Sequence, residues 1–328
     1  KRDEAIAEYN RTLGLAPAEG YTVKTWGQYC LEEVWPQELR EGTLEDYENA
    51  LRVHIYPVFG YVNLGDVRAQ EVQRFFNRLG EKLTRQSVLK VRTVFSSLMT
   101  RAVVNDLITG NPVRDVKVKA APFDPDAKAD KRILTAEEST ALLNHTSATY
   151  IHSAALLALK MGLRAGECLG LLWRDVDFDR GTITVRRQLQ RVVGKGLVVT
   201  PPKTSHSNRT LKMPPAVREH LLAERQSTKS LYVVANGLGK PLEQSRLRQM
   251  FNNCAWSAGL MTTTDEDGAP LIKPTFHDLR STFLSHAAER GANPRQLMEL
   301  AGHSTPATTL AHYVRANTAG LDALMESA

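Results

Sequence analysis

Six side chains between residues 164 and 313 have the types that phosphoryl transfer to a tyrosine requires. They are Arg164 in GLRAGE, Lys203 in PPKTSHSNRT, His277 and Arg280 in HDLR, His303 in AGHST, and Tyr313. A phosphodiester under attack spreads negative charge over its non-bridging oxygens, and fixed guanidinium and imidazole groups can stabilise that charge without a metal ion. The phenol of Tyr313 would be the nucleophile, and the ammonium of Lys203, crowded by other cations, would be the acid. The set predicts a metal-free site that cuts and rejoins DNA.

The length and composition of the chain limit the protein class. A chain of 328 residues exceeds one ordinary core, so we expect two domains. It contains no apolar run of membrane-spanning length and does not start with a signal segment, so we expect a cytoplasmic protein without membrane contact. Cys30, Cys168 and Cys254 lack the spacing of a disulfide framework or a zinc site. We expect them to be reduced, buried and inert.

Positive charge is concentrated in one part of the chain. The formal net charge is +6, and nine Lys or Arg residues but no Asp or Glu lie between Arg180 and Arg218. Such a run favours contact with the phosphates of a nucleic acid. Within it we assign DNA contacts to Arg186, Arg187 and Arg209.

Residues 20–115 have the periodicity of a helical domain. Apolar residues recur at helical spacing over 23–34, 44–55, 69–79 and 87–104, with Pro and Gly breaks at Pro36, Gly42, Pro57 and Gly60. The apolar face of the last segment consists of Val88, Val91, Phe95, Leu98, Met99 and Ala102. Arg85 and Arg92 lie together along the edge of this face. DNA phosphate contact and ordinary surface charge are equally open interpretations for both.

The remainder of the chain is predicted to be helical except for one small sheet. A polar helix is expected over 1–18 and an extended linker over 116–133. Thr135 and Glu138 predict a capped helix to residue 144, and a second helix over 150–161 is ended by Gly162. We expect strands at 182–186, 197–200, 209–211 and 231–234, with Lys203 in the hairpin loop between the second and third.

Three stretches, GLRAGECLGLLWRDVDFD, HDLRSTFLSHA and LAGHSTPATTLAHY, resemble the signature stretches of the tyrosine recombinase, or phage integrase, family. Residues 20–115 are similar to the core-binding domain of that family. The resemblance implies a mainly α fold with a small antiparallel β-sheet, in which a helical SAM-like domain and a catalytic domain form a C-shaped clamp. The expected divisions are a linker helix at 1–19, the core-binding domain at 20–115, the linker at 116–133, the catalytic domain at 134–316 and a tail at 317–328. We expect an upstream arm-binding domain to be missing from this chain, and the tail to dock on a neighbouring protomer.

The same resemblance implies a role for each catalytic side chain. Arg164 and Arg280 would hold the scissile phosphate with His303, while Glu167 would orient Arg164 or a neighbour. His277 would either accept the tyrosine proton or donate a hydrogen bond to the phosphate.

Strand exchange would proceed through a covalent intermediate. Tyr313 would form a 3′-phosphotyrosine, Lys203 would protonate the departing 5′ oxygen, and the released 5′-hydroxyl would attack the partner duplex. No cofactor, metal or ATP is needed, because the covalent bond stores the energy.

The implied function is site-specific recombination that integrates or excises a mobile element. The expected partners are double-stranded DNA recombination sites, three further copies of the chain in a tetramer on two duplexes, and an excisionase or a host DNA-bending protein. Two alternatives are a type IB topoisomerase-like enzyme and a non-catalytic DNA-binding protein of the same fold. A metal site formed by His277, His303 and His312 is disfavoured, because no carboxylate or second His at i+4 spacing completes it. Taken alone, Arg164 and Glu167 would be interpreted as a local ion pair.

Overall fold

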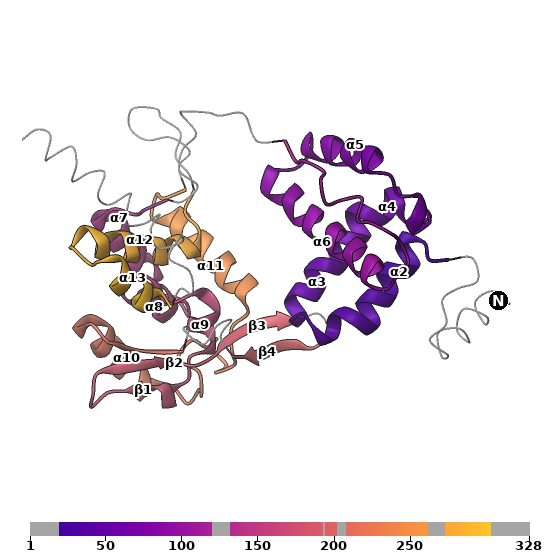
Figure 1. Ribbon diagram of the computed structural model, residues 1–328. Coiled ribbons are helices and arrows are strands. Elements are labelled where there is room, and N and C mark those ends of the chain that lie inside the picture. Colours follow the sequence, from indigo (N-terminus) through magenta and orange to yellow (C-terminus); the bar gives the residue numbers. More distant parts are fainter. Residues whose placement is uncertain (1–19, 120–131, 193, 202–207, 262–272, 303–328) are drawn as a thin grey trace, which may run out of the picture. The chain divides into compact units, whose positions relative to one another are not determined.

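The computed structural model describes residues 20–119, 132–192, 194–201, 208–261 and 273–302 (Figure 1). The chain divides into two compact units, Lys1–Asp126 and Ala127–Ala328, each with its own hydrophobic core. Within the described ranges, no helix has both the length and the apolar character needed to cross a membrane.

In the described residues of unit 1, all the regular elements are helices, joined by turns and one isolated β-bridge between Thr22 and Asn63. The helices are α2 (Val23–Tyr29), η1 (Cys30–Val34), η2 (Trp35–Gln37), α3 (Glu41–Ala50), η3 (Leu51–Ile55), α4 (Tyr56–Phe59), η4 (Leu64–Asp66), α5 (Ala69–Gly80) and α6 (Arg85–Val104). The predicted apolar face of α6 is confirmed, since all six of its residues are buried. Across the core, the indole Nε1 of Trp26 donates a hydrogen bond to the carbonyl of Leu98 at 3.1 Å.

Two π-turns in unit 1 each precede an aromatic residue and a proline. In η1 the N–H of Trp35 donates to the carbonyl of Cys30, and in η3 the N–H of Tyr56 donates to that of Leu51. A proline ring clashes with the carbonyl four residues earlier, and the wider π-turn relieves this clash. The predicted break at Pro57 is therefore wrong, because the helix continues through it as α4.

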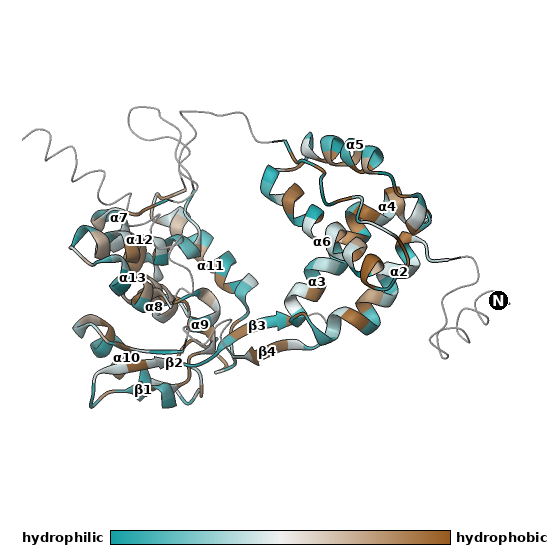
Figure 2. Ribbon diagram, viewed as in Figure 1, coloured by the Kyte–Doolittle hydropathy of each residue, from teal (hydrophilic) through white to brown (hydrophobic). Residues whose placement is uncertain are grey.

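The helices of unit 2 surround the buried helix α8. They are α7 (Ala136–Thr146), α8 (His152–Met161), α9 (Ala165–Gly170), η5 (Trp173–Asp175), α10 (Pro215–Ser227), α11 (Gln244–Ser257), α12 (Phe276–Glu289) and α13 (Pro294–Ala301). Helices α7, α9, α10 and α12 all contact α8, most of whose residues are buried. Figure 2 shows hydrophobic residues along these helices. The capping box of Thr135 and Glu138 at the start of α7 is confirmed.

The strands of unit 2 correct the predicted sheet. In the described residues, β1 (Val176–Asp177), β2 (Thr182–Val185) and β5 (Arg209–Lys212) form one antiparallel sheet, while β3 (Gln188–Val192) and β4 (Gly196–Thr200) form another. The predicted hairpin between residues 197–200 and 209–211 is wrong. Pairing with β2 places Leu211 opposite Ile183 on the buried side, whereas β4 pairs with β3, its neighbour in the chain. Lys203 thus belongs to the connection between two sheets.

Two further details of unit 2 differ from the expectation. Residues 231–234 form only an isolated bridge, between Leu172 and Tyr232. Strand β3, which was not predicted, packs closely on α9. A Cβ atom at Gly170 would lie 2.9 Å from the backbone of Leu189, so only glycine permits this approach.

Candidate active site

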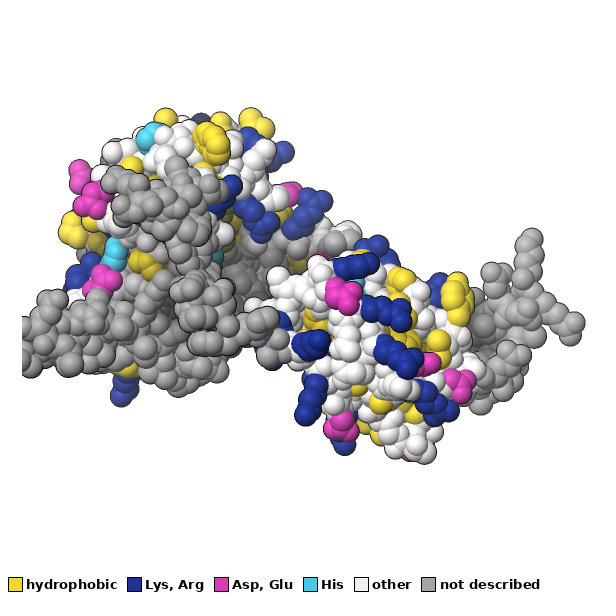
Figure 3. Space-filling view, turned by 90° about the horizontal axis from the view of Figure 1, so that it is seen from above, with side chains coloured by type: hydrophobic (Ala, Val, Ile, Leu, Met, Phe, Trp, Pro, Cys, Tyr) yellow, Lys and Arg dark blue, Asp and Glu magenta, His cyan; other side chains and the backbone are white. Residues whose placement is uncertain are grey.

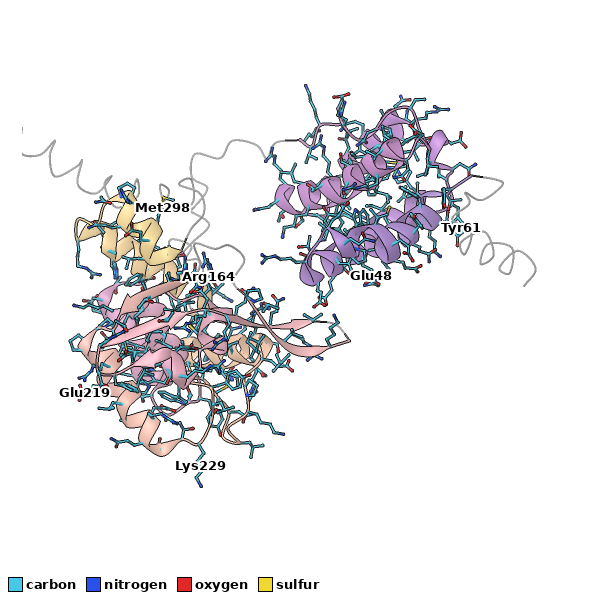
Figure 4. All side chains as sticks on the ribbon, turned by 60° about the horizontal axis from the view of Figure 1, so that its bottom comes forward. Glu48, Tyr61, Arg164, Glu219, Lys229 and Met298 are labelled. Atoms are coloured by element: carbon cyan, nitrogen blue, oxygen red, sulfur yellow. The ribbon has the colours of Figure 1, made fainter. Side chains whose placement is uncertain are left out.

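Two arginines of unit 2 bind the carboxylate of Glu167. The Nη1 atom of Arg164 lies 2.7 Å from Oε1, and the backbone N–H of Arg164 donates to Oε2 at 2.9 Å. Arg209 donates to the same two oxygens through Nη1 and Nη2, at 3.2 and 3.0 Å. Glu167 is buried, whereas the Arg164 side chain is 32% exposed. One side of the cluster is therefore open at Arg164, which Figure 4 labels beside the yellow helices α12 and α13.

The position of Arg164 follows from the way α8 ends. Gly162 has a positive φ of 69° that terminates α8, and a Cβ atom there would lie 2.5 Å from the ring of Phe283. Arg164 is then the N-cap of α9, and the side chain of Glu167 accepts the hydrogen bond of its backbone N–H. The local ion pair considered above is present, and it forms part of a larger cluster.

Arg280 joins the cluster from α12. Asp278 caps this helix by accepting hydrogen bonds from the N–H and the hydroxyl of Thr275, both at 2.7 Å. This cap fixes the first turn, on which His277 is exposed and Arg280 is buried. The guanidinium of Arg280 donates to the carbonyls of Gly162 and Ala301.

Cations outnumber the anion in this cluster. Burial alone would raise the pKa of Glu167, but the charges and hydrogen bonds of Arg209 and Arg164 outweigh burial and hold the pKa below its ordinary value. Burial, followed by repulsion from Arg164, lowers the pKa of Arg280 to about 9. This pKa keeps Arg280 protonated at neutral pH. With three arginines around one carboxylate, the cluster carries a net positive charge that an anion would stabilise.

Three successive carbonyls at the end of α13 and its C-cap point into this cluster. Arg209 Nε donates to Leu300 at 3.0 Å, Arg280 donates to Ala301, and Arg164 Nη2 donates to Gly302 at 3.1 Å. The final carbonyls of a helix have no intrahelical donor and carry partial negative charge, so cations stabilise them. Three arginines from α9, β5 and α12 thus fix the chain immediately before His303.

Three of the predicted catalytic residues, Lys203, His303 and Tyr313, lie outside the described residues. Of the predicted set, the structure brings together Arg164, Arg280 and Glu167, with His277 on the same first turn as Arg280. The roles assigned to all these residues stay predictions.

Four of the residues predicted to contact DNA have partners within the protein. Arg92 donates to the carbonyls of Val116 and Arg114 at 2.9 and 2.7 Å, which holds the chain that leaves α6. Arg187 pairs with the buried Asp175, and its side chain is 15% exposed.

Arg209 differs most from its expected position, because its side chain is 7% exposed and belongs to the cluster around Glu167. Arg85 and Arg186 are exposed, as a DNA contact requires, and Arg186 Nε lies 4.0 Å from the carboxylate of Asp175. For these two the prediction stands untested.

A basic stripe on unit 1 was missed at the level of sequence. Arg74 and Arg78 on α5, and Lys82 just after it, are exposed and follow one another at i+4 spacing. They line a groove of about 600 Å³ whose other side includes Val53 and Val58. Figure 3 shows Lys and Arg side chains spread over this unit with hydrophobic side chains between them. The i+4 spacing of the cations was the available signal.

The cysteines and the histidines offer no alternative chemistry in the described residues. Cys30, Cys168 and Cys254 are unpaired and buried, as predicted, and burial raises the pKa of each thiol. Within the described ranges, no three of His, Cys, Asp and Glu form a group that could hold a metal ion. His303 and His312 of the alternative metal site lie outside those ranges.

Comparison with known proteins agrees with this geometry. Residues 132–319 match the model of the phage integrase family, and residues 23–80 match the N-terminal SAM-like domain of phage integrases. The chain is 26% identical to a tyrosine recombinase XerC-like protein of Caldanaerobacter subterraneus, over 88% of this chain and 77% of that protein. It is 29% identical to the integrase of Mycobacterium phage L5, over 95% of this chain and 80% of that protein.

Two solved structures share the fold. The Tn1549 transposon integrase in complex with transposon right-end DNA has a TM-score of 0.75 at 22% identity, covering 93% of this chain and all of that one. A lambda integrase tetramer bound to a Holliday junction has a TM-score of 0.68 at 19% identity, covering 90% and 78%.

The matched model spans more than half of the chain, so this protein belongs to the phage integrase family. It is a tyrosine recombinase, and members of this family break and rejoin DNA. The expected combination of a SAM-like N-terminal domain with a mainly helical catalytic domain is confirmed.

Proposed function

We propose that this chain recombines double-stranded DNA at specific sites and thereby integrates or excises a mobile element. The phenolic oxygen of Tyr313 attacks the scissile phosphorus. The bond between phosphorus and the 5′ oxygen then breaks, and Lys203 protonates this leaving oxygen. The released 5′-hydroxyl of one duplex then attacks the phosphotyrosine of the other, which restores the phenol and joins the strands. No net hydrolysis occurs, because each phosphoester bond that breaks is replaced.

The observation that supports this proposal most directly is the cluster of Arg164, Arg209 and Arg280 around the carboxylate of Glu167. Its excess positive charge is already in place before an anion arrives. A transition state with a more highly charged phosphoryl group gains more from such a preorganised cluster than the ground state does. The open side of Arg164 is where we place the scissile phosphate, with Arg280 behind it.

We assign His303 to the scissile phosphate as well. Support comes from Gly302, the preceding residue in the chain, whose carbonyl accepts a hydrogen bond from Arg164. His277 occupies the exposed position on the first turn of α12, three residues before Arg280. We assign it to the proton of the tyrosine or to a phosphate oxygen.

We assign DNA backbone contacts to exposed cations of each unit. In unit 1 these are Arg85 and the stripe of Arg74, Arg78 and Lys82, and in unit 2 the candidate is Arg186. Cations on a surface bind phosphates and release counterions, so the affinity for DNA falls steeply as salt rises.

We also propose that four protomers assemble on two duplexes, with residues 317–328 docking on a neighbouring protomer and with help from an excisionase or a host DNA-bending protein. The lambda integrase tetramer on a Holliday junction supports the assembly by analogy. Removal of residues 318–328 is expected to weaken the pairing of two DNA sites, as measured by gel mobility, and unchanged assembly would contradict the proposal.

The test of the chemistry uses a nicked suicide duplex that carries a candidate recombination site. Cleavage releases a short fragment that diffuses away, so protein becomes trapped covalently on the DNA. The wild-type chain is expected to be trapped and Tyr313→Phe is not. Equal trapping of both would reject Tyr313 as the nucleophile, and relaxation of any supercoiled plasmid without strand exchange would favour the topoisomerase-like alternative. Trapping is expected to persist in EDTA.

A further inference from the structure

We infer that Arg209 is a positioning residue for the recombination reaction: its guanidinium joins β5, the start of α9 and the end of α13 into one rigid support beneath the phosphate site. This inference rests on the proposed function. It differs from the DNA contact expected from the basic run, because Arg209 is directed into the protein.

The guanidinium of Arg209 donates hydrogen bonds from three nitrogens to two residues that lie on different elements. Nη1 and Nη2 bind the two carboxylate oxygens of Glu167 side by side, at 3.2 and 3.0 Å, while Nε donates to the carbonyl of Leu300 at 3.0 Å. The side chain is 7% exposed. A planar fork of fixed donors matches this arrangement, whereas the single ammonium of lysine cannot present two parallel donors to one carboxylate and a third donor to a separate carbonyl.

Each of the elements that Arg209 joins leads to a different part of the proposed reaction. Glu167 holds the backbone N–H and the side chain of Arg164, which we place against the phosphate. Leu300 precedes Ala301 and Gly302, whose carbonyls bind Arg280 and Arg164 and lead directly to His303. Arg209 itself begins β5, six residues after Lys203 in the chain.

Arg209 also sets the charge state of Glu167. The groups that face this carboxylate are Arg164 of its own segment, Arg209 of β5, Arg280 of α12 and the buried thiol of Cys168. Burial raises the pKa of Glu167, and the contribution of Arg209 is the first that opposes it. In a variant without this charge, Arg164 still opposes burial but Arg209 no longer does, so the carboxylate takes up a proton at a higher pH than in the wild type.

The test compares Arg209→Lys and Arg209→Gln with the wild-type chain in single-turnover cleavage of the suicide duplex, together with DNA affinity. Arg209→Lys is expected to lower the cleavage rate roughly 10- to 100-fold, as small misplacements of a catalytic group do, while DNA affinity changes little. The pH at which its rate falls on the acid side is unchanged, because the charge is retained. Arg209→Gln is expected to lower the rate and also to shift this acid limb to higher pH.

The matched control is Arg132→Lys. Arg132 pairs with Glu138 in the same unit, and its side chain is 9% exposed, so this variant disturbs a comparable ion pair away from the cluster. It is expected to cleave at the wild-type rate. Circular dichroism at each pH gives the folded fraction of every variant. It thereby distinguishes unfolding of a variant from a lower cleavage rate of the folded protein.

A second measurement does not depend on DNA chemistry. Hydrogen exchange of the α13 amides, over residues 295–301, is expected to become faster in Arg209→Lys and to stay unchanged in Arg132→Lys. Wild-type cleavage by Arg209→Lys, or a rate loss no larger than its loss of folded protein, would overturn the inference while leaving the proposed function intact. If the wild-type chain itself is never trapped on DNA, the proposed function fails, and unchanged α13 exchange in Arg209→Lys would then overturn the positioning role as well.

Discussion

Replacing Glu167 with glutamine is expected to destabilise unit 2 strongly. The carboxylate is 2% exposed and accepts four hydrogen bonds from Arg164 and Arg209. The amide of glutamine keeps one acceptor, but its NH₂ group would face guanidinium donors, and the arginines would lose their counterion. Breaking one partner of a buried ion pair typically costs about 3–5 kcal/mol of the free energy of unfolding. Since a domain has only about 5–15 kcal/mol in total, this loss is large.

Differential scanning calorimetry measures the effect directly. For a unit of this size, 1 kcal/mol corresponds to about 2–4 °C, so the midpoint of unit 2 is expected to fall by about 6–20 °C at pH 7. Glu224→Gln is the matched control, because Glu224 lies on α10 of the same unit and its side chain is 41% exposed. It is expected to shift the midpoint by less than about 2 °C, as exposed ion pairs contribute little.

The pH dependence provides a second check with a definite sign. The pKa of Glu167 is lower in the folded protein than in the unfolded chain. The stabilisation that the charged form of Glu167 gives to the folded state is therefore complete above the pKa of the unfolded chain, near 4.3. It is lost as the pH falls through the lower pKa of the folded state. The difference in stability between the wild type and Glu167→Gln is expected to be constant near neutral pH and to shrink in acid. A midpoint shift at pH 7 no larger than that of Glu224→Gln would refute the reasoning.

Other perturbations test the surrounding structure. Gly162→Ala combines a left-handed backbone with a clash against Phe283, so its loss in the free energy of unfolding is expected to exceed the about 1–2 kcal/mol of the backbone alone. Gly181→Ala has a positive φ but open space around the glycine, and it is expected to lose only that amount. Equal losses for the two variants in urea unfolding would reject the clash. Phe95→Ala removes a fully buried ring and is expected to cost about 3–5 kcal/mol in unit 1, without moving the calorimetric midpoint of unit 2. Lys203→Ala is expected to lose cleavage and to regain it on a substrate whose bridging 5′ oxygen is sulfur, which leaves without an acid; absence of rescue would count against the acid role.

The helices were predictable because their signals are local. The capping box of Thr135 and Glu138 and the stop at Gly162 depend on residues a few positions apart, and the structure contains both. The break expected at Pro57 failed because the effect of proline was offset by a π-turn, for which the sequence offered only the preceding aromatic residue as a sign.

The pairing of the strands was less predictable, because it depends on contacts far apart in the sequence. Strand β3 has Gln188, Gln190 and Arg191 among its residues and shows weak β character, so the neighbour of β4 went unnoticed. Gly166 and Gly170, four residues apart, were a usable sign that a backbone lies against α9.

Within the site, residue types indicated Arg164 and Arg280, since they stand in recognisable motifs. Arg209 was assigned to the DNA surface because its sequence neighbourhood is basic. Its burial became apparent only when β5 was placed beside β2, which turns its side chain toward Glu167. A contact between residues far apart in the chain cannot be predicted from the local spacing of residue types.

The three arginine contacts at the end of α13 also have a consequence for synthesis of the protein. They join residues separated by 138, 91 and 21 positions, and the bond from Arg280 to Gly162 spans 118. A nascent chain that has not yet emerged from the ribosome as far as residue 302 cannot assemble this support. A translation product that stops before residue 302 therefore lacks these long-range contacts between the arginines and the end of α13.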